Sequence, residues 1–292
     1  MSNLAEKRNK LVSFVKYKVN HLSNKLFTNG HQPQPVISVV ASAHKVGSTW
    51  LVKMIRDLYI FAHPTVPEPY RPEPQHTKLF DLQSDIALGF MNQGVAEHTL
   101  FKSHSQPPAW EPPAHVKLIT IFRDPRDMVV SNIFYLANLD PKYGGWEGLA
   151  EKEPRDRIPV YLNRAVFDLE LYERWNKYPF ALKLTYEQLK EDAISGMQEV
   201  VNFLEIEVPQ SRIEAAVENN SFKKLSAGRK AGEANDKSFF RKGISGDWLN
   251  YFDQEMVEIF KTTHGGRWNQ LLVDLGYEEN LDWQLTDYQV NA

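Results

Sequence analysis

Short apolar runs alternate with amphipathic stretches along most of this chain. Runs of β-branched and aromatic residues bounded by polar ones predict strands over 36–40, 99–104, 116–123 and 180–186. Apolar residues at helical spacing predict helices over 49–62, 124–139, 160–178, 194–204, 212–217 and 252–264. Alternation of this kind predicts an α/β fold, in which helices cover both faces of a central parallel sheet.

The ends of the chain and one internal segment depart from this pattern. Residues 1–35 are rich in lysine and carry leucines near helical spacing, so we expect a basic helix or arm followed by a linker. The alternating pattern predicts a single domain over 36–280, and residues 281–292 are expected to form a tail. Prolines crowd the segment 63–75, which predicts an irregular surface loop.

Composition narrows the possible functions and locations. The net charge of −3 gives no general attraction to nucleic acid, so any anion site has to be local. The absence of cysteine excludes disulfides and zinc–thiolate sites, and it fits a reducing compartment. No apolar run reaches the length of a membrane span, and no signal peptide is visible. We therefore expect a cytoplasmic protein without stable membrane insertion.

The most informative segment is the sequence S-A-H-K-V-G-S-T-W at residues 42–50, directly after the first predicted strand. Gly47 lets backbone N–H groups turn inward, and the helix that follows adds unpaired donors and its positive dipole end. Ser48 and Thr49 add hydroxyl groups, and Lys45 adds a positive charge. The lysine precedes the glycine, so this is not the P-loop pattern G-x-x-x-x-G-K-[ST]. The segment predicts a site for a phosphate or sulfate group, as part of a nucleotide.

A second anion motif follows the third predicted strand, at I-F-R-D-P-R-D-M-V-V-S. Asp124 suits a helix N-cap, Pro125 the first helical position, and Asp127 the back-bonding position of a capping box. Arg123 lies at the strand end, and Ser131 follows about two helical turns after the helix begins. An arginine fork beside a hydroxyl group suits a phosphate monoester.

A third motif, R-K-G-I-S-G-D-W at residues 241–248, combines two cations with a glycine. On composition alone it would be a solvated turn. Taken together and in this order, the three motifs resemble those of the sulfotransferases that use 3′-phosphoadenosine-5′-phosphosulfate (PAPS). That family has T-Y-P-K-S-G-T-T-W, R-[ND]-P-[KR]-D-x-x-x-S and R-K-G-x-x-G-D-W at the corresponding places. The resemblance implies the P-loop-NTPase-like sulfotransferase fold, with PAPS as co-substrate and PAP as product.

The same resemblance assigns residues to each part of the nucleotide. The 5′-phosphosulfate loop corresponds to Lys45, Val46, Gly47, Ser48, Thr49 and Trp50. The 3′-phosphate site corresponds to Arg123, Ser131, Arg241, Lys242 and Gly243. The adenine contacts correspond to Trp50, Tyr186, Asn220 and Phe222, the last two matching the family's N/T-S-F element.

The resemblance also supplies a catalytic hypothesis. Lys102 and His104 match the family's K-[TS]-H, which implies that His104 deprotonates the hydroxyl or amine of a small-molecule acceptor. A neutral imidazole can accept a proton near neutral pH. Lys45 and Lys102 would stabilise charge on the transferring group and the leaving oxygen. Fixed lysines can serve where kinases need magnesium, so we predict no metal requirement.

Two other functions would fit parts of the same sequence. One is a P-loop-like small-molecule kinase with Asp124 as a magnesium ligand, which the missing GK[ST] argues against. The other is a catalytically dead nucleotide-binding protein, which the retained Lys45, Lys102 and His104 argue against. The acceptor is not readable from the sequence. Residues 249–258 lack the dimer motif K-x-x-x-T-V-x-x-x-E of animal cytosolic enzymes, which leaves the oligomeric state open.

Overall fold

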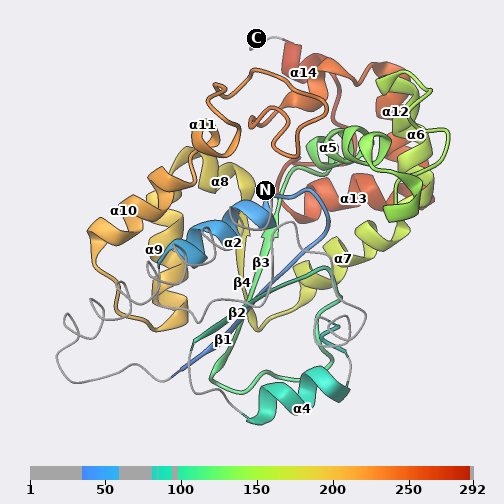
Figure 1. Ribbon diagram of the computed structural model, residues 1–292. Helices are drawn as coiled ribbons and strands as arrows, with labels where there is room; N and C mark the ends of the chain where they lie inside the picture. The colour runs from blue at the N-terminus through green and yellow to red at the C-terminus, as the bar shows by residue number, and fades with distance from the viewer. Residues whose placement is uncertain (1–34, 59–80, 84, 94–97, 290–292) are drawn as a thin grey trace.

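A computed structural model describes residues 35–58, 81–83, 85–93 and 98–289 of the chain. Its four strands form one parallel sheet in the order β2-β1-β3-β4 (Figure 1). All four predicted strands are confirmed to within one residue at each end. They are β1 (Ile37–Ala41), β2 (Thr99–Ser103), β3 (Val116–Phe122) and β4 (Ala181–Thr185). The basic segment 1–34 and the proline-rich loop 63–75 lie outside the described residues.

The sheet is covered on both faces, as the sequence predicted. Every residue of β1 is buried, and so are nearly all residues of β3. Because successive side chains of a strand point to opposite faces, this pattern requires packing on both sides. The register pairs Ala41 with Ser103, so β1 and β2 end at the same edge. The residues that follow the strands are brought to that edge.

One group of helices lies on the left of the sheet in Figure 1 and packs through contacts of α2 with α10, α10 with α9, and α9 with α8. In this group α2 contacts β1 and β2, whereas α8 and α9 contact β4. This group consists of α2 (Ser48–Asp57), α8 (Tyr186–Glu191), α9 (Ala193–Leu204), α10 (Gln210–Asn219) and α11 (Phe222–Leu225). Each amphipathic helix buries its apolar stripe; in α9 the buried residues are Met197, Val200, Val201 and Leu204.

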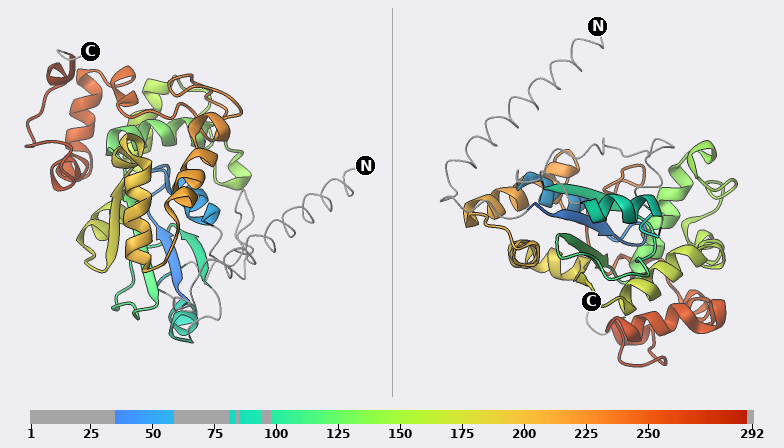
Figure 2. Two further views of the ribbon diagram at one scale, coloured as in Figure 1. Left: turned by 90° about the vertical axis from the view of Figure 1, so that its left-hand side faces the viewer. Right: turned by 90° about the horizontal axis from the view of Figure 1, so that it is seen from below.

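A second group lies toward the C-terminal end of the chain, where α5 contacts α6 and α13 contacts α12 and α7 (Figures 1 and 2). Its α-helices are α5 (Pro125–Asn138), α6 (Pro154–Arg164), α7 (Val166–Lys177), α12 (Gln254–Thr262), α13 (Arg267–Asp274) and α14 (Thr286–Gln289). Three short 3-10 turns accompany them: η1 (Pro141–Tyr143), η2 (Asp247–Asn250) and η3 (Thr263–Gly266). The last helix in the described ranges, α4 (Asp85–Gln93), lies near the opposite end of the sheet from α5.

Several helix predictions need correction. The single helix predicted over 160–178 is wrong, because the backbone leaves the helical region at Ala165 (φ −85°, ψ 36°) and divides it into α6 and α7. The helix α6 also begins before Pro159, which it contains. The helix predicted over 212–217 is longer in the structure, where α10 spans Gln210–Asn219. The helix α13 is not among the predicted ones. The helix predicted over 49–62 ends at Asp57, and residues 59–62 are not described.

Candidate active site

A cleft with an open volume of about 1050 Å³ lies at the edge where the parallel strands end. Such edges are where ligands bind in open α/β sheets. Nearly all the site residues predicted from the sequence line it, although they come from distant segments. They are Lys45, Gly47, Ser48, Thr49, Trp50, Lys102, His104, Arg123, Ser131, Tyr186, Asn220, Phe222, Arg241, Lys242 and Gly243.

Val46, also predicted as part of the phosphosulfate loop, is the one predicted site residue that does not line the cleft. Its side chain is fully buried in the hydrophobic core and points away from the cleft. The neighbouring residues turn the opposite way because the loop has left-handed backbone conformations at Lys45 (φ 61°) and Gly47 (φ 100°). Val46 therefore anchors the loop to the core.

Gly47 is required by its surroundings as well as by its backbone conformation. It is the N-cap of α2, and a Cβ atom there would lie 2.8 Å from Cδ2 of Tyr186. Since glycine has no side chain with which to cap the helix, the first N–H groups of α2 remain free to bind an anion in the cleft. Ser48 and Thr49, the first two residues of α2, place their side chains at the same point.

Lys45 extends from this loop toward two aromatic rings. Its Nζ lies 3.7 Å from the ring centre of Phe239 and 4.4 Å from that of Tyr135, and it donates to the Phe239 carbonyl at 3.4 Å. Desolvation in the cleft, followed by the charges of Lys102, Arg123 and Arg241, lowers the pKa of Lys45 to about 7. This cluster of cations has too few local counter-charges, which favours binding of an anion.

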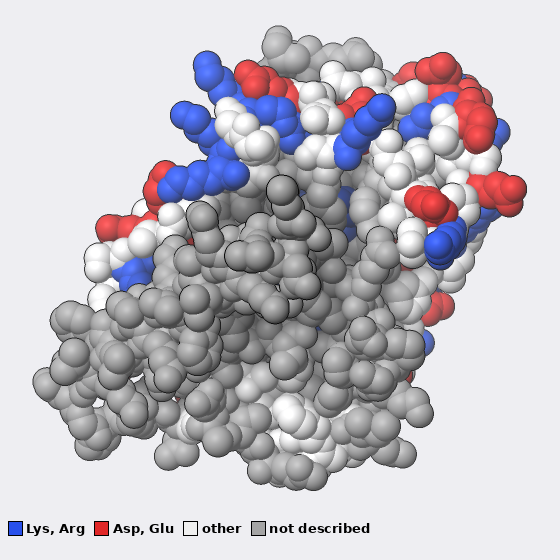
Figure 3. Space-filling view, viewed as in Figure 1, with Lys and Arg blue, Asp and Glu red and all other residues white. Residues whose placement is uncertain are grey.

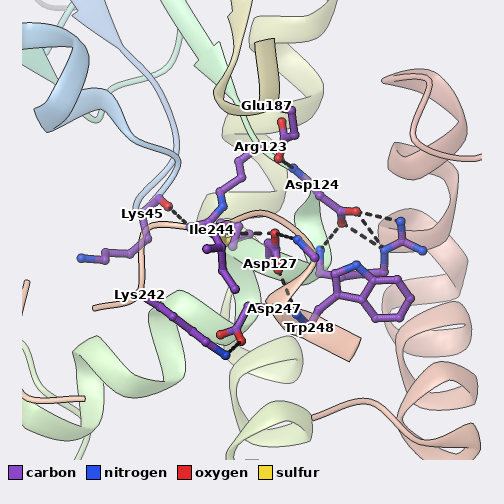
Figure 4. A network of polar contacts seen from close by, with 12 residues as sticks. Lys45, Arg123, Asp124, Asp127, Glu187, Lys242, Ile244, Asp247 and Trp248 are labelled. Atoms are coloured by element: carbon purple, nitrogen blue, oxygen red, sulfur yellow. Dashed lines mark hydrogen bonds and ion pairs between the residues drawn. The ribbon is translucent and has the colours of Figure 1, made fainter. Parts of the chain in front are cut away.

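Arg123, at the end of β3, is held in place by several groups. It donates from Nη2 to the Ile244 carbonyl at 2.9 Å and from Nη1 to the Lys45 carbonyl at 3.4 Å (Figure 4). Its guanidinium lies over the ring of Tyr186, 4.5 Å from the centre, and its Nη2 lies 3.6 Å from Oδ2 of Asp127. Its buried Nε has no hydrogen-bond partner among the described residues. Arg123 therefore retains donor capacity beside the cleft.

The second motif behaves only partly as predicted. Asp124 is the N-cap of α5, with its carboxylate accepting from the Arg126 backbone at 2.8 Å, and Pro125 is the first helical residue. The capping-box role of Asp127 is wrong. Its two oxygens instead accept from the backbone N–H groups of Gly246 at 2.7 Å and Trp248 at 2.9 Å (Figure 4). Asp127 thus fixes the third motif against the second.

The two hydrogen bonds that Asp127 accepts from Gly246 and Trp248 predict a loss of stability in the Asp127→Ala variant. The variant would leave two backbone donors without an acceptor, so we expect the free energy of unfolding to fall by about 1–3 kcal/mol. Thermal and urea denaturation would measure it, with Asp156→Ala as a control because Asp156 is exposed on α6. Equal stability of the two variants would contradict the role given to Asp127.

Arg241 and Lys242 share the counter-charge of Asp247, and Nη1 of Arg241 also lies 3.6 Å from Oδ1 of the exposed Asp236. Both form ion pairs with Asp247, which is buried, and Asp247 retains its charge because these cations outweigh the effect of burial and lower its pKa. The guanidinium of Arg241 also lies 4.5 Å from the ring centre of Phe134, and its Nε is buried without a partner among the described residues. Both cations line the cleft, and ion pairs to two carboxylates hold Arg241 there.

Aromatic side chains form the side of the cleft beside α10 and α11. Trp50 donates from its indole N–H to the Asn220 carbonyl at 2.9 Å and meets the Tyr186 ring edge-on at 5.8 Å. The Asn220 side chain is committed elsewhere, since it donates to Asp57 and to the Ala216 carbonyl. A Cβ atom on Gly243 would lie 2.2 Å from the Phe222 ring, so the absence of a side chain there lets the ring lie against the backbone.

Lys102 and His104 lie at the end of β2, Lys102 within the strand and His104 directly after its last residue. His104 Nδ1 lies 2.8 Å from the Ser42 carbonyl, which only accepts, so Nδ1 carries the hydrogen and Nε2 the lone pair. Lys102 Nζ lies 3.0 Å from that Nε2. Burial, together with the neighbouring His44 and Lys102, lowers the pKa of His104 well below its usual value. The imidazole is thus neutral, in the tautomer that can accept a proton at Nε2.

The cleft also contains residues that the sequence analysis missed: His44, Tyr135, Lys190, Leu225, Phe239, Phe240 and Ile244. His44 lies next to Lys45, so its position in the first motif was the available signal. Phe239 and Phe240 directly precede the third motif, but a pair of aromatic residues gives no sign of a ligand site. In the described part of the chain, no three His, Asp or Glu side chains are grouped as a metal site requires.

The sequence profile of the sulfotransferase domain matches residues 37–271, which is most of the chain. The chain belongs to the sulfotransferase domain family. Curated relatives include rat sulfotransferase 1 family member D1, 31% identical over 159 residues that make up 50% of this chain and 52% of the rat protein. This match therefore spans about half the length of the relative. Human sulfotransferase 6B1 is 27% identical over 78% of this chain and 76% of its own.

Solved structures with the same fold include members of this family. Mouse sulfotransferase SULT7A1, complexed with PAP, aligns with a TM-score of 0.56 and 19% identity over 89% of this chain and 90% of its own. Retinol dehydratase, in complex with androsterone and inactive cofactor PAP, aligns with a TM-score of 0.54 and 21% identity over 82% of each chain. At these identities the likeness establishes the sulfotransferase fold, as the sequence motifs predicted.

None of the helices in the described ranges combines the length and the apolar character that crossing a membrane would need.

Proposed function

We propose that this chain transfers the sulfuryl group of PAPS to a hydroxyl or amine of a small-molecule acceptor. The observation that carries the proposal is the cleft itself, which gathers all three anion motifs and the Lys102–His104 pair around one space. Membership of the family supports it, and so do the related structures, which were solved in complex with PAP. One domain over 36–280 and a small-molecule acceptor remain part of this proposal.

The free polar groups of the cleft fit such a nucleotide. The N–H groups at the start of α2, with Ser48 and Thr49, suit the 5′-phosphate. Arg123 and Arg241 both line the cleft, and their guanidinium groups suit a second phosphate at a distance from the first. Trp50 and Phe222 offer flat faces for a base. A ligand with two anionic ends and an aromatic ring is thus accommodated.

The distribution of charge over the surface agrees with an anionic ligand. Lys and Arg side chains gather at the upper left of Figure 3, in the region where Figure 1 places α11. The helix α11 itself carries Lys223 and Lys224. Although the whole chain is slightly acidic, a local positive field of this kind would raise the rate at which an anion reaches the cleft.

PAPS supplies an activated sulfuryl group, and the residues of the chain would act on the proton and on the charge. His104 Nε2 would take the proton of the acceptor hydroxyl or amine, while the Ser42 carbonyl holds Nδ1–H in place. Lys102 now donates to Nε2, so it must turn away before the proton arrives. Lys102 and Lys45 would then stabilise negative charge on the transferred group and the leaving oxygen.

The proposal is tested by incubating the chain with PAPS and a panel of phenols, alcohols and amines, and measuring PAP by chromatography. We expect PAP to form together with a sulfated product, at a rate that EDTA leaves unchanged because fixed lysines replace a metal. Turnover of ATP but not PAPS, or a rate abolished by EDTA and restored by magnesium, would favour the kinase alternative. Binding of PAP without turnover of any acceptor would favour the dead nucleotide-binding protein.

A further prediction concerns the pH dependence of nucleotide binding. The pKa of Lys45 is about 7 in the free protein, and a bound phosphate would favour the ammonium form and raise that pKa. Between the two pKa values binding takes up a proton, so affinity for PAP should fall as the pH rises from about 7 to about 9. Calorimetry in buffers of different ionisation enthalpy would detect this uptake. Lys45→Met should abolish it, and an unchanged uptake in that variant would refute the assignment.

A further inference from the structure

Residues 226–246 connect α11 to η2 and form neither helix nor strand. Every residue from 230 to 237 is exposed, so burial in the core cannot fix the shape of this part of the segment. The second half of the segment supplies six residues that line the cleft: Phe239, Phe240, Arg241, Lys242, Gly243 and Ile244. Polar contacts must therefore hold the exposed half in place beside them.

Arg229 provides most of these contacts from a single side chain. Its Nη1 donates to the carbonyls of Glu233 at 2.9 Å and Arg241 at 2.6 Å. Its Nη2 donates to the hydroxyl of Ser238 at 3.0 Å and to the carbonyl of Phe240. A guanidinium can bridge four acceptors in this way because its donors point outward from one rigid plane.

The backbone closes the same segment on itself. The N–H of Gly232 donates to the Lys242 carbonyl at 2.9 Å, and the N–H of Asn235 donates to the Arg241 carbonyl at 3.0 Å. The Arg241 carbonyl thus accepts from both Asn235 and Arg229. The exposed half of the segment is tied to the third motif, and Arg229 lies where the two halves meet.

Arg229 also contacts the part of the cleft assigned to adenine. Its guanidinium lies 5.4 Å from the ring centre of Phe222, within the range of a cation–π contact. Phe222 lines the cleft and lies against Gly243 of the third motif. Arg229 itself is not among the described residues that line the cleft, so it can affect a ligand only through these neighbours.

We propose that Arg229 is a positioning residue that orders the segment before the nucleotide binds, so that Arg241, Lys242 and Phe222 already lie where PAP needs them. This inference rests on the proposed use of PAPS. A segment that is ordered in the free protein loses less conformational freedom on binding, which raises the affinity for the ligand. Arg229 therefore acts on affinity and makes no contact with the reacting atoms.

Calorimetry of Arg229→Ala with PAP and 5′-AMP tests the effect on affinity. Arg157→Ala is the matched control, because Arg157 also donates to two loop carbonyls, those of Lys152 at 2.8 Å and Ala150 at 3.2 Å, but does not line the cleft. We expect Arg229→Ala to bind PAP about tenfold more weakly, the cost of ordering one or two long side chains on binding. The affinity for 5′-AMP should fall less, because 5′-AMP lacks the phosphate assigned to Arg241 and Lys242. The control should bind both nucleotides as the unaltered chain does.

Trypsin cleavage of the free chain separates this role from a general loss of stability. Lys230 and Lys237 are exposed within the segment, so cleavage after them reports on its order. We expect cleavage to be about tenfold faster or more in Arg229→Ala, with an unchanged melting temperature, and unchanged in the control. Added guanidinium ion, compared with sodium chloride at equal ionic strength, should slow the cleavage and restore PAP affinity in Arg229→Ala.

Two results would overturn the proposal: cleavage and PAP affinity equal to those of Arg157→Ala, or a loss of affinity without faster cleavage. Should Arg229→Ala fail to fold, Arg229→Lys decides by the same readouts, because an ammonium has three donors and cannot bridge four acceptors. Absence of PAP binding by the unaltered chain would instead refute the proposed function, and the cleavage rates of the free chain would still decide the role of Arg229.

Discussion

Replacing His104 with alanine is expected to lower kcat by about 1000-fold, within the range for loss of a general base, and to leave PAP affinity almost unchanged. The Ser42 carbonyl keeps the hydrogen of His104 on Nδ1, so the lone pair lies on Nε2. This Nε2 lies beside Lys102, where it can accept the acceptor's proton. The neutral state of His104 follows from burial and nearby cations, which keep its pKa low. The side chain therefore acts on the acceptor's proton rather than on the nucleotide.

The control for this variant is His115→Ala. His115 is also a partly buried histidine with one ring nitrogen near a carbonyl, that of Met91 at 2.7 Å, but it does not line the cleft. We expect its kcat to be that of the unaltered chain. Single-turnover measurements with saturating PAPS would isolate the chemical step. A loss of less than about tenfold in His104→Ala would mean that another group is the base.

The second large effect is expected for Arg123→Ala, which should weaken PAP binding by about 100-fold and leave 5′-AMP binding nearly unchanged. Two charge-assisted hydrogen bonds to a phosphate, at about 1.5 kcal/mol each, account for this factor. The loss should be selective for PAP, because Arg123 is assigned to the 3′-phosphate that 5′-AMP lacks. Its hydrogen bonds to the carbonyls of Ile244 and Lys45 place it between the third motif and the first. Calorimetry with both nucleotides would measure the two affinities.

Arg155→Ala is the matched control for Arg123, because Arg155 forms an exposed ion-pair network with Asp253 and Glu255. It should bind PAP with unchanged affinity. Arg123 also pairs with Asp127, so the melting temperature of Arg123→Ala has to be measured to confirm that the variant is folded at the temperature of the titration. A folded Arg123→Ala variant with unchanged preference for PAP over 5′-AMP would show that the 3′-phosphate lies elsewhere.

The sequence was sufficient for the sheet and for most of the residues around the cleft. Strand ends could be placed because buried β-branched runs stop at polar residues such as Ser42 and Arg123, and parallel strands end at a common edge. The residues around the cleft could be predicted because the segments around Lys45, Arg123 and Arg241 match family patterns in the same order. Composition alone would have left the segment after Arg241 as a solvated turn.

The errors share a physical cause, which is that local patterns do not specify tertiary partners. Asp127 has the spacing of a capping box, yet its oxygens bind Gly246 and Trp248, more than a hundred positions along the chain. Helical periodicity continues through both α6 and α7, so the pattern gives no sign of the break at Ala165. The hydrogen bond between His44 and Asp168 joins residues 124 positions apart, so no local spacing could have predicted it.

Calorimetry of the unaltered chain with PAP, 5′-AMP and ATP tests the assignment of the cleft to PAPS. We expect PAP to bind at least about 100-fold more tightly than 5′-AMP, because the 3′-phosphate engages Arg123 and the third motif. ATP should bind no better than 5′-AMP. A preference for ATP, or equal affinity for PAP and 5′-AMP, would contradict the assignment of the cleft to PAPS.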